Sequence, residues 1–179
     1  TRLMFAGGEP DAAIDDVVEV HAVTFALQCA LTALWDSKGL TLDILFGHSL
    51  GQYAAACAAG VFSRSDGMRV VLRRGEIIRD MPPHGTMAVV HADEVSVRRH
   101  LADAGDPLDV AVVNSPENTV VSGPADAIAA WQAGAPFEVR LLGSLRAGHS
   151  RLMRAGAPDL VSAFREITLT SPAKPLICN

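Results

Sequence analysis

A short apolar run that leads directly into a Gly-x-Ser-x-Gly turn constrains the fold of this chain more than any other feature. Residues 42–46 are few and apolar enough for a buried strand, and Gly47-His48-Ser49-Leu50-Gly51 follows at once. The alanine-rich residues 53–59 then predict a helix that stops at Gly60. Strand, sharp turn and helix in this order are the setting of a nucleophile elbow, in which the serine hydroxyl projects away from the backbone.

The turn itself makes steric and electrostatic demands on its residues. We expect Gly47 and Gly51 to supply freedom of φ and to let the strand and the helix approach closely. The amides of Leu50 and Gly51 open the helix without intrahelical partners, so they are predicted to point at charge that develops on a carbonyl bound to Ser49. The structural alternative is a tight strand-to-helix turn in which the serine only caps the helix.

Two further helices flank this elbow in the sequence. Apolar residues at intervals of three or four predict a helix over residues 17–38, ended by Gly39, and His21 within it is interpreted as a packed or hydrogen-bonded histidine. Residues 63–66 resemble a capping box and predict a helix with a solvated face that includes Arg73. Arg74 lies instead at the edge of the buried stripe, where its guanidinium can reach into a cleft.

Beyond the Pro82-Pro83-His84-Gly85 break the pattern changes. Strand, helix, strand, strand, helix and strand are predicted over residues 86–143, which is the ferredoxin-like order. The fold class is therefore α/β, a hydrolase-like parallel-sheet core with a nucleophile elbow plus an inserted ferredoxin-like subdomain. We assign residues 1–85 and 144–179 to the core and 86–143 to the insert. A helix beyond Pro158 and a strand over residues 167–169 are expected in the returning segment.

Composition excludes several classes of protein. A net charge of −5 without a basic run argues against a nucleic-acid partner or an anionic membrane surface. No stretch approaches the roughly 20 continuous apolar residues of a membrane span, and no signal peptide opens the chain. Three cysteines without metal-ligand spacing predict no metal site and suit the reducing cytoplasm, where we expect the protein. The two ends read as cut, so we expect a piece of something longer.

Several ordered motifs together resemble the acyltransferase domains of modular polyketide synthases, which are relatives of the malonyl-CoA:ACP transacylases. The likeness extends over nearly the whole chain. The matching pieces are Phe25-Ala26-Leu27-Gln28 with Trp35, Gly47-His48-Ser49-Leu50-Gly51, Ala58-Ala59-Gly60-Val61-Phe62-Ser63, Arg74-Gly75, Ala111-Val112-Val113-Asn114-Ser115-Pro116, Val120-Val121-Ser122-Gly123 and His149-Ser150 with Met153.

The resemblance implies a mechanism in which Ser49 takes a malonyl-type acyl group from coenzyme A as an ester. The group then passes to the phosphopantetheine thiol of an acyl carrier protein, with His149 as general base and then general acid. Arg74 would pair with the free carboxylate of the acyl group. His48 would help to shape the site, the Leu50 amide would be an oxyanion donor, and Asn114 would line the site. The domain would bind no cofactor of its own, and neighbouring synthase domains are expected partners.

The chain also departs from the family pattern. Arg146-Ala147-Gly148-His149 stands where malonyl-selective members tend to have His-Ala-Phe-His and methylmalonyl-selective members Tyr-Ala-Ser-His. Leu50 favours malonyl as the acyl group, whereas Gly148 removes the bulk that would exclude a 2-substituent. The two signals disagree, and we expect malonyl rather than methylmalonyl or another 2-substituted malonyl. The family's glutamine oxyanion loop and its C-terminal part have no counterpart here, so we expect this piece alone to be poorly folded or nearly inactive.

Two other functions compete with this one. An α/β-hydrolase such as a thioesterase shares the elbow, but it needs an acid after a later strand, and the aspartates between Ser49 and His149 in the sequence that could serve fall in the expected insert. A non-catalytic fragment that only docks within a synthase is the second alternative. Transfer that requires a carrier protein distinguishes the acyltransferase from both.

Overall fold

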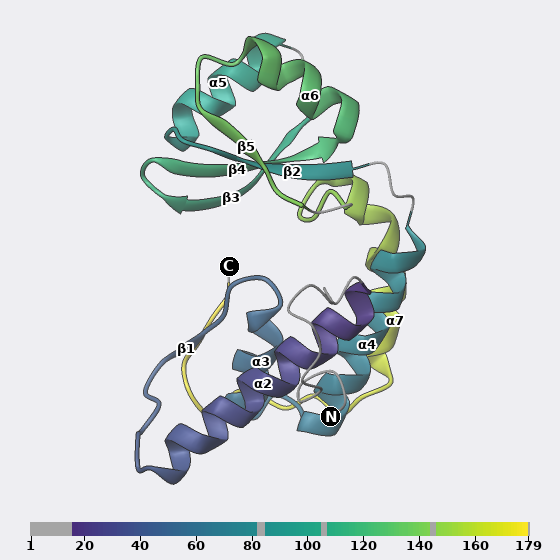
Figure 1. The fold of residues 1–179 in the computed structure, drawn as a ribbon. Helices are drawn as coiled ribbons and strands as arrows, with labels where there is room; N and C mark the ends of the chain where they lie inside the picture. Colours follow the sequence, from purple (N-terminus) through teal and green to yellow (C-terminus); the bar gives the residue numbers. More distant parts are fainter. Residues whose placement is uncertain (1–15, 82–84, 105–106, 144–145, 179) are drawn as a thin grey trace, which may run out of the picture. The chain divides into compact units, whose positions relative to one another are not determined.

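The computed structural model describes residues 16–81, 85–104, 107–143 and 146–178 and divides into two compact units (Figure 1). The first unit comprises Thr1–Asp80 and Pro158–Asn179, and the second unit is Met81–Ala157. The first unit is discontinuous in sequence and carries the elbow. The second unit contains the whole range expected for the ferredoxin-like insert.

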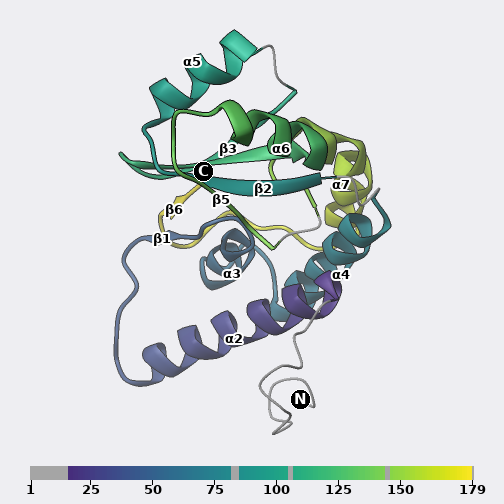
Figure 2. The ribbon, with the colours of Figure 1, turned by 45° about the horizontal axis from the view of Figure 1, so that its top comes forward.

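The first unit combines helices with a short parallel sheet. Its helices are α2 (Val17–Ser37), α3 (Gly51–Ala58), α4 (Arg64–Asp80) and α7 (Ala157–Arg165). Its strands β1 (Leu45–Phe46) and β6 (Leu176–Ile177) pair in parallel, with Leu45 opposite Leu176 (Figure 2). A parallel pair followed by a helix at the carboxyl end of β1 agrees with the expected α/β core. The strand expected over residues 42–46 is shorter than predicted, since only Leu45 and Phe46 pair, and only Leu45 of the two is buried.

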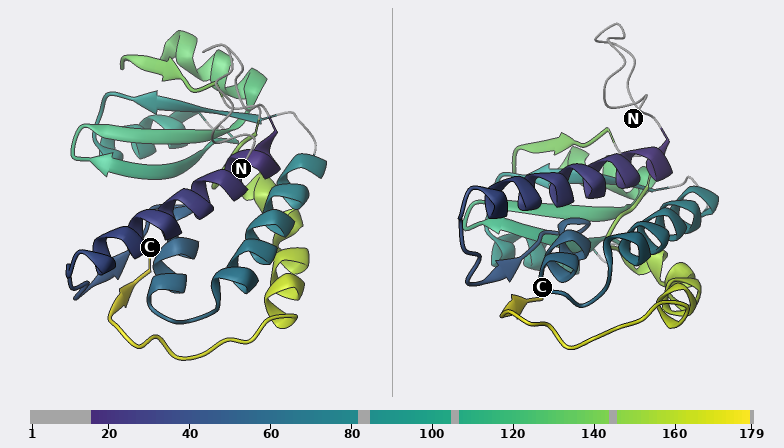
Figure 3. Two further views of the ribbon diagram at one scale, coloured as in Figure 1. Left: turned by 60° about the horizontal axis from the view of Figure 1, so that its bottom comes forward. Right: turned by 90° about the horizontal axis from the view of Figure 1, so that it is seen from below.

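Helices α2 and α4 lie side by side (Figure 3), and glycines on α4 make their contact close. A Cβ on Gly75 would lie 2.7 Å from the Cα atom of Val18, and one on Gly67 would lie 2.6 Å from the ring of Phe25. Val71, between these glycines on the same stripe, is fully buried. The four-residue spacing of Gly67, Val71 and Gly75 therefore forms a groove that receives α2.

The ends of these helices follow the sequence signals. The Asp16 carboxylate caps α2 by accepting from the Val18 amide, and Gly39 ends it with a φ of 82°. The Ser63 hydroxyl accepts from the Asp66 amide and donates to the Asp66 carboxylate, which confirms the capping box before α4.

Helix α2 is also, within the described ranges, the one helix long and apolar enough to cross a membrane by length and composition alone. Core helices of globular proteins and signal sequences meet the same test. Its apolar residues are interrupted by Thr24, Gln28 and Thr32, and one side of it packs on α3 and α4. Several large apolar side chains on it, including Leu31 and Leu34, are exposed in this chain.

The second unit is an antiparallel sheet with two helices on one face (Figure 1). Its elements are β2 (Gly85–Val90), α5 (Glu94–Ala104), β3 (Asp109–Ser115), β4 (Asn118–Pro124), α6 (Ala125–Gly134) and β5 (Val139–Leu141). The strand order is β3-β4-β2-β5, and every neighbouring pair is antiparallel. This is the ferredoxin-like arrangement that the order of elements predicted.

The core of the second unit lies between its sheet and its helices. Ala88 and Val90 alternate inward along β2 and pack with Val97, Ile128 and Trp131. Gly85 and Ala147, which flank the range expected for the insert, lie against each other, because a Cβ at Gly85 would collide with Ala147. The insert therefore leaves and rejoins the rest of the chain at neighbouring points.

One expected strand is absent. Residues 167–169 form no strand in the structure. The segment runs instead past the end of α3, where the Thr170 amide donates to the Val61 carbonyl and the Ala173 amide to the Ala59 carbonyl. Its β-branched residues favoured a strand, but the residues that follow it bond to carbonyl groups of the turn after α3, which offers no strand to pair with.

Candidate active site

Ser49 sits at a strained point of the turn between β1 and α3. Its φ is 51°, in the left-handed region that residues with a side chain rarely adopt. Ser49 and His149 are the two residues other than glycine with positive φ in the described part of the chain. Backbone strain of this kind costs about 1–3 kcal/mol and collects at functional sites, so the two expected catalytic residues are also the two strained ones.

The glycines of the elbow do not contribute equally. A Cβ on Gly47 would collide with the Gly51 carbonyl group, so Gly47 is required for β1 and α3 to come this close. A Cβ on Gly51 would meet nothing nearer than the Gln28 side chain at 3.7 Å, an ordinary contact. The expectation that both glycines permit the approach was right for Gly47 and wrong for Gly51, and the positive φ is carried by Ser49 itself.

The two amides at the start of α3 differ in whether they are hydrogen-bonded. The Gly51 amide donates to the His48 carbonyl at 2.9 Å, which corrects the expectation that it is open. No hydrogen bond from the Leu50 amide to a protein acceptor is found among the described residues. Among the described residues, the Leu50 amide is therefore a donor at the start of α3 that could face an oxyanion.

Arg74, on α4, is held by side chains from two other helices of the first unit. Its Nη1 lies 3.0 Å from Nε2 and 3.2 Å from Nδ1 of His21 on α2. Its Cζ lies 5.8 Å from the centre of the Tyr53 ring on α3, a distance typical of a cation–π contact. No carboxylate pairs with Arg74 in the parts of the chain that the structure describes.

Burial and the nearby guanidinium set the charge of these neighbours. Burial, followed by the positive charge of Arg74, lowers the pKa of His21 to about 4, so the ring is neutral near pH 7. Burial also raises the pKa of Tyr53, opposed in part by Arg74. The result is a cation between two neutral rings, a suitable receptor for a carboxylate.

His149 lies in the second unit on a tight turn. The Ser150 amide donates to the Ala147 carbonyl at 3.3 Å, and His149, the third residue of the turn, has a φ of 60°. Type II turns require positive φ at this position and usually place glycine or asparagine there. The buried Ser150 hydroxyl also donates to Ala147 and accepts from the Leu152 amide at the start of the 3-10 helix η1 (Arg151–Gly156).

A charged contact anchors this turn to the sheet of the second unit. The Arg151 guanidinium donates to both carboxylate oxygens of Asp109 at the start of β3, and the Arg151 amide adds a bond of 2.7 Å. These bonds lower the pKa of Asp109. Because Arg151 follows His149 by two residues, the contact fixes where the turn sits on its own unit.

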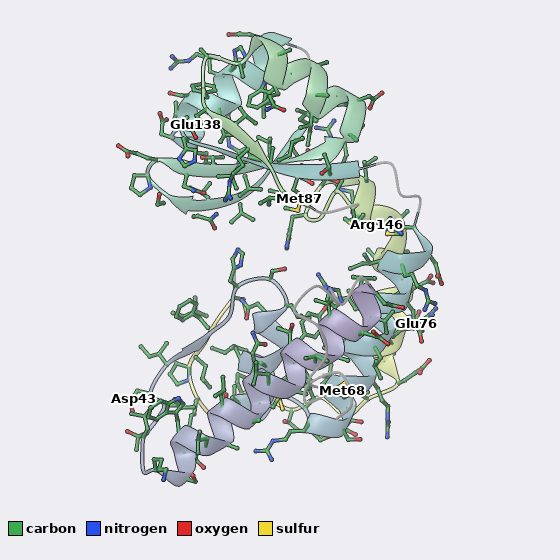
Figure 4. All side chains as sticks on the ribbon, in the orientation of Figure 1. Asp43, Met68, Glu76, Met87, Glu138 and Arg146 are labelled. Carbon is green, nitrogen blue, oxygen red and sulfur yellow. The ribbon has the colours of Figure 1, made fainter. Side chains whose placement is uncertain are left out.

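The remaining predicted site residues are placed as follows. His48 is exposed on the elbow. Asn114 is exposed near the end of β3 and donates to the Asn118 side chain, as a hairpin residue does. Gly148 lies beside Met87 of β2, whose Sδ would be 3.3 Å from a Cβ at that position. Figure 4 shows Met87 on the face of the sheet away from α5 and α6.

The cysteines and the acidic residues offer no second site. Cys29 and Cys57 are half-buried thiols, and burial raises the pKa of both, that of Cys29 to about 11. Within the described residues no group of three or more histidine, cysteine, aspartate or glutamate side chains could hold a metal ion.

Sequence reasoning missed the two neighbours of Arg74. His21 was interpreted as a packed or hydrogen-bonded histidine, which its contact with Arg74 confirms, but Arg74 was not named as its partner. Tyr53 was assigned no function beyond its helix. No local sequence pattern identifies these partners, because they follow from the packing of α2 on α4, in which Val18 meets Gly75.

Comparison with known proteins identifies the family of this chain. Residues 8–178 match the family model described as the acyl transferase domain. Polyketide synthase GfsA of Streptomyces halstedii is 35% identical over 170 residues, which are 93% of this chain and 2% of that protein. A non-reducing polyketide synthase of Emericella nidulans is 36% identical over 160 residues, 86% of this chain and 6% of that protein. The chain thus spans a small part of these relatives.

Solved structures show the same likeness. The acyltransferase domain from the second module of the salinomycin polyketide synthase has a TM-score of 0.87 at 34% identity, over 96% of this chain and 41% of that one. The malonyl CoA-acyl carrier protein transacylase of Coxiella burnetii has a TM-score of 0.87 at 25% identity, over 95% and 57%.

The family match over residues 8–178 and these similar structures place the chain among acyltransferase domains. The chain belongs to the acyl transferase domain family, and it resembles the members of that family found in polyketide synthases.

Proposed function

We propose that this chain moves a malonyl-type extender unit from coenzyme A to the phosphopantetheine thiol of an acyl carrier protein during polyketide synthesis. The observation that carries the proposal is the strained Ser49 on its elbow, in the same unit as an arginine without a carboxylate partner among the described residues. A serine nucleophile and a guanidinium that no carboxylate neutralises among the described residues together suit an acyl donor with a second, charged carboxyl group.

The proposed reaction has two matched halves. The Ser49 hydroxyl attacks the thioester carbonyl, the carbon–sulfur bond breaks, and His149 passes the serine proton to the departing thiolate of coenzyme A. The carrier-protein thiol then attacks the acyl-serine ester, and His149 returns a proton to Ser49. The open Leu50 amide stabilises the oxyanion in both halves.

Within this proposal the preferred unit is malonyl. Met87 stands beside Gly148, so a sulfur atom lies near the space that the small residue leaves. Leu50 supports the same preference through its resemblance to malonyl-selective members. The partners would be acyl-CoA, a carrier protein and neighbouring synthase domains, and the free thiols suit a cytoplasmic protein.

The test is intact-mass spectrometry of the full-length protein after exposure to malonyl-CoA and, separately, methylmalonyl-CoA. We expect a malonyl adduct that maps to Ser49, that disappears in Ser49→Ala, and that is discharged only by a carrier protein. A Cys57→Ala variant serves as the control and should acylate normally. An adduct that persists in Ser49→Ala, or rapid release of free acid without carrier protein, would contradict the proposal.

A further inference from the structure

His21 and Arg74 form a contact for which the acyl-transfer chemistry above gives no role. The two residues lie 53 positions apart in the sequence, His21 on α2 and Arg74 on α4. Nη1 of Arg74 lies within hydrogen-bond distance of both ring nitrogens of His21. A neutral imidazole always has one nitrogen without a proton, so either tautomer can accept from the guanidinium.

We propose that His21 is a positioning residue for Arg74, which fixes the orientation in which the guanidinium meets the carboxylate of the acyl group. The proposal rests on the proposed function, because it assumes that Arg74 receives that carboxylate. It concerns the selection of the substrate and gives His21 no part in the bond-making steps.

The first argument for this role is that His21 contacts Arg74 without neutralising its positive charge. Arginine side chains lose much rotational freedom when they are fixed, and acidic residues are their usual anchors. An aspartate or glutamate at position 21 would hold Arg74 but would also neutralise it and compete with the substrate. An imidazole contacts one terminal nitrogen of the guanidinium and leaves its positive charge in place.

The second argument for this role is that the Tyr53 ring on α3 packs against the same guanidinium. The Tyr53 ring lies 5.8 Å from Arg74 Cζ, and it stacks on Phe164 of α7 with a centroid distance of 6.1 Å. The guanidinium is therefore restrained by a hydrogen bond from α2 and by a ring that is itself packed. Neither restraint carries a negative charge.

The third support is the charge state that the contact requires. An imidazolium would turn a donor and a second positive charge toward Arg74, so the contact depends on a neutral ring. The charged group that faces His21 is Arg74 from α4, and Tyr53 from α3 faces Arg74 in turn. Because the pKa of His21 is lowered to about 4, the ring is neutral near pH 7.

The test compares kcat/KM for malonyl-CoA and acetyl-CoA in the full-length protein and in variants of position 21. We expect His21→Leu to lower the malonyl-to-acetyl ratio about tenfold, the effect of one hydrogen bond to a charged group, chiefly through KM. His21→Gln offers an amide oxygen as acceptor and should recover most of the ratio. Thr32→Val, on the same helix, removes a hydroxyl that bonds only within α2 and should leave the ratio unchanged.

The same ratio measured in His21→Glu is a second test, which does not depend on whether His21→Leu folds. The new carboxylate should pair with Arg74, keep the protein folded and abolish the preference for malonyl as fully as Arg74→Ala does. A malonyl preference in His21→Glu or His21→Leu equal to that of Thr32→Val would overturn the positioning role. Arg74→Ala separates the two proposals, since an unchanged ratio in that variant contradicts the proposed function itself.

Discussion

Gly75 of α4 and Val18 of α2 approach so closely that a Cβ on the glycine would lie 2.7 Å from the Cα atom of the valine. Arg74 precedes Gly75, and His21 follows Val18 by about one turn. The missing side chain at position 75 thus lets the two helices bring the arginine to its histidine. The packing of the helices and the preparation of the candidate carboxylate receptor are one feature of the fold.

The elbow glycines provide a matched pair of variants. Gly47→Ala should destabilise the protein severely, because the new Cβ collides with backbone atoms of Gly51 that cannot move aside. Gly51→Ala should change the free energy of unfolding by no more than about 1 kcal/mol, and in the stabilising direction, because alanine favours the helix. Thermal unfolding of both variants is the measurement. Equal melting temperatures would show that the elbow is looser than described.

Removal of the Arg74 guanidinium should change which acyl group is used. We expect Arg74→Ala to lose roughly ten- to a hundredfold in kcat/KM for malonyl-CoA, since a hydrogen bond to a charged group contributes about 1.5–3 kcal/mol. Acetyl-CoA should be affected much less. Arg73→Ala is the control, because Arg73 is exposed and paired with Glu76. If both variants keep the malonyl-to-acetyl ratio, Arg74 does not receive the carboxylate.

The stability of the protein should depend on pH through His21. Its pKa is 6.5 when unfolded and about 4 when folded, so below pH 6.5 the unfolded chain binds a proton that the folded chain refuses. This contribution to stability is fully present above pH 6.5 and is lost as the pH falls toward 4. Melting temperatures of His21→Gln should therefore decline less over this range than those of the wild type, whereas His91→Gln, at an exposed position, should follow the wild type.

The three cysteines should differ in their rate of alkylation. Cys178 is exposed, whereas burial raises the pKa of Cys29 from 9.0 to about 11 and that of Cys57 in the same direction. For Cys29 this lowers the reactive thiolate fraction near pH 8 about a hundredfold. Iodoacetamide followed by peptide mapping should find Cys178 modified first, and in urea all three should react alike. Fast modification of Cys57 in the folded protein would reopen the question of which residue is the nucleophile.

Local patterns predicted the parts of this fold that local physics determines. The order of strand, helix, strand, strand, helix and strand expected over residues 86–143 is observed, because apolar spacing and flanking turns are both local signals. The elbow was predicted because strand, glycine and serine are adjacent in sequence. The strand expected over residues 167–169 failed because strand formation depends on a neighbour, and the neighbour of that segment is the end of a helix.

Motifs in the sequence named the residues of the candidate site, but they did not name the side chains that contact Arg74. Ser49, Arg74 and His149 were proposed from motifs. The unusual φ of the elbow was expected at Gly47 and Gly51 but is found at Ser49, and none was predicted at His149. The partners of Arg74 lie on other helices and follow from how α2 and α4 pack. Sequence periodicity shows which face of a helix is apolar, but it does not show which residue of another helix meets a given arginine.

The near contact of Gly85 with Ala147 has a consequence for the order of folding. The second unit is one continuous stretch, so it can form from contacts of modest sequence separation. Strands β1 and β6, by contrast, must find each other across that whole stretch. Once the insert has folded with its ends together, it acts as a short connection, and the entropic cost of closing the long loop has already been met. We therefore expect the parallel pairing to form late, after the insert.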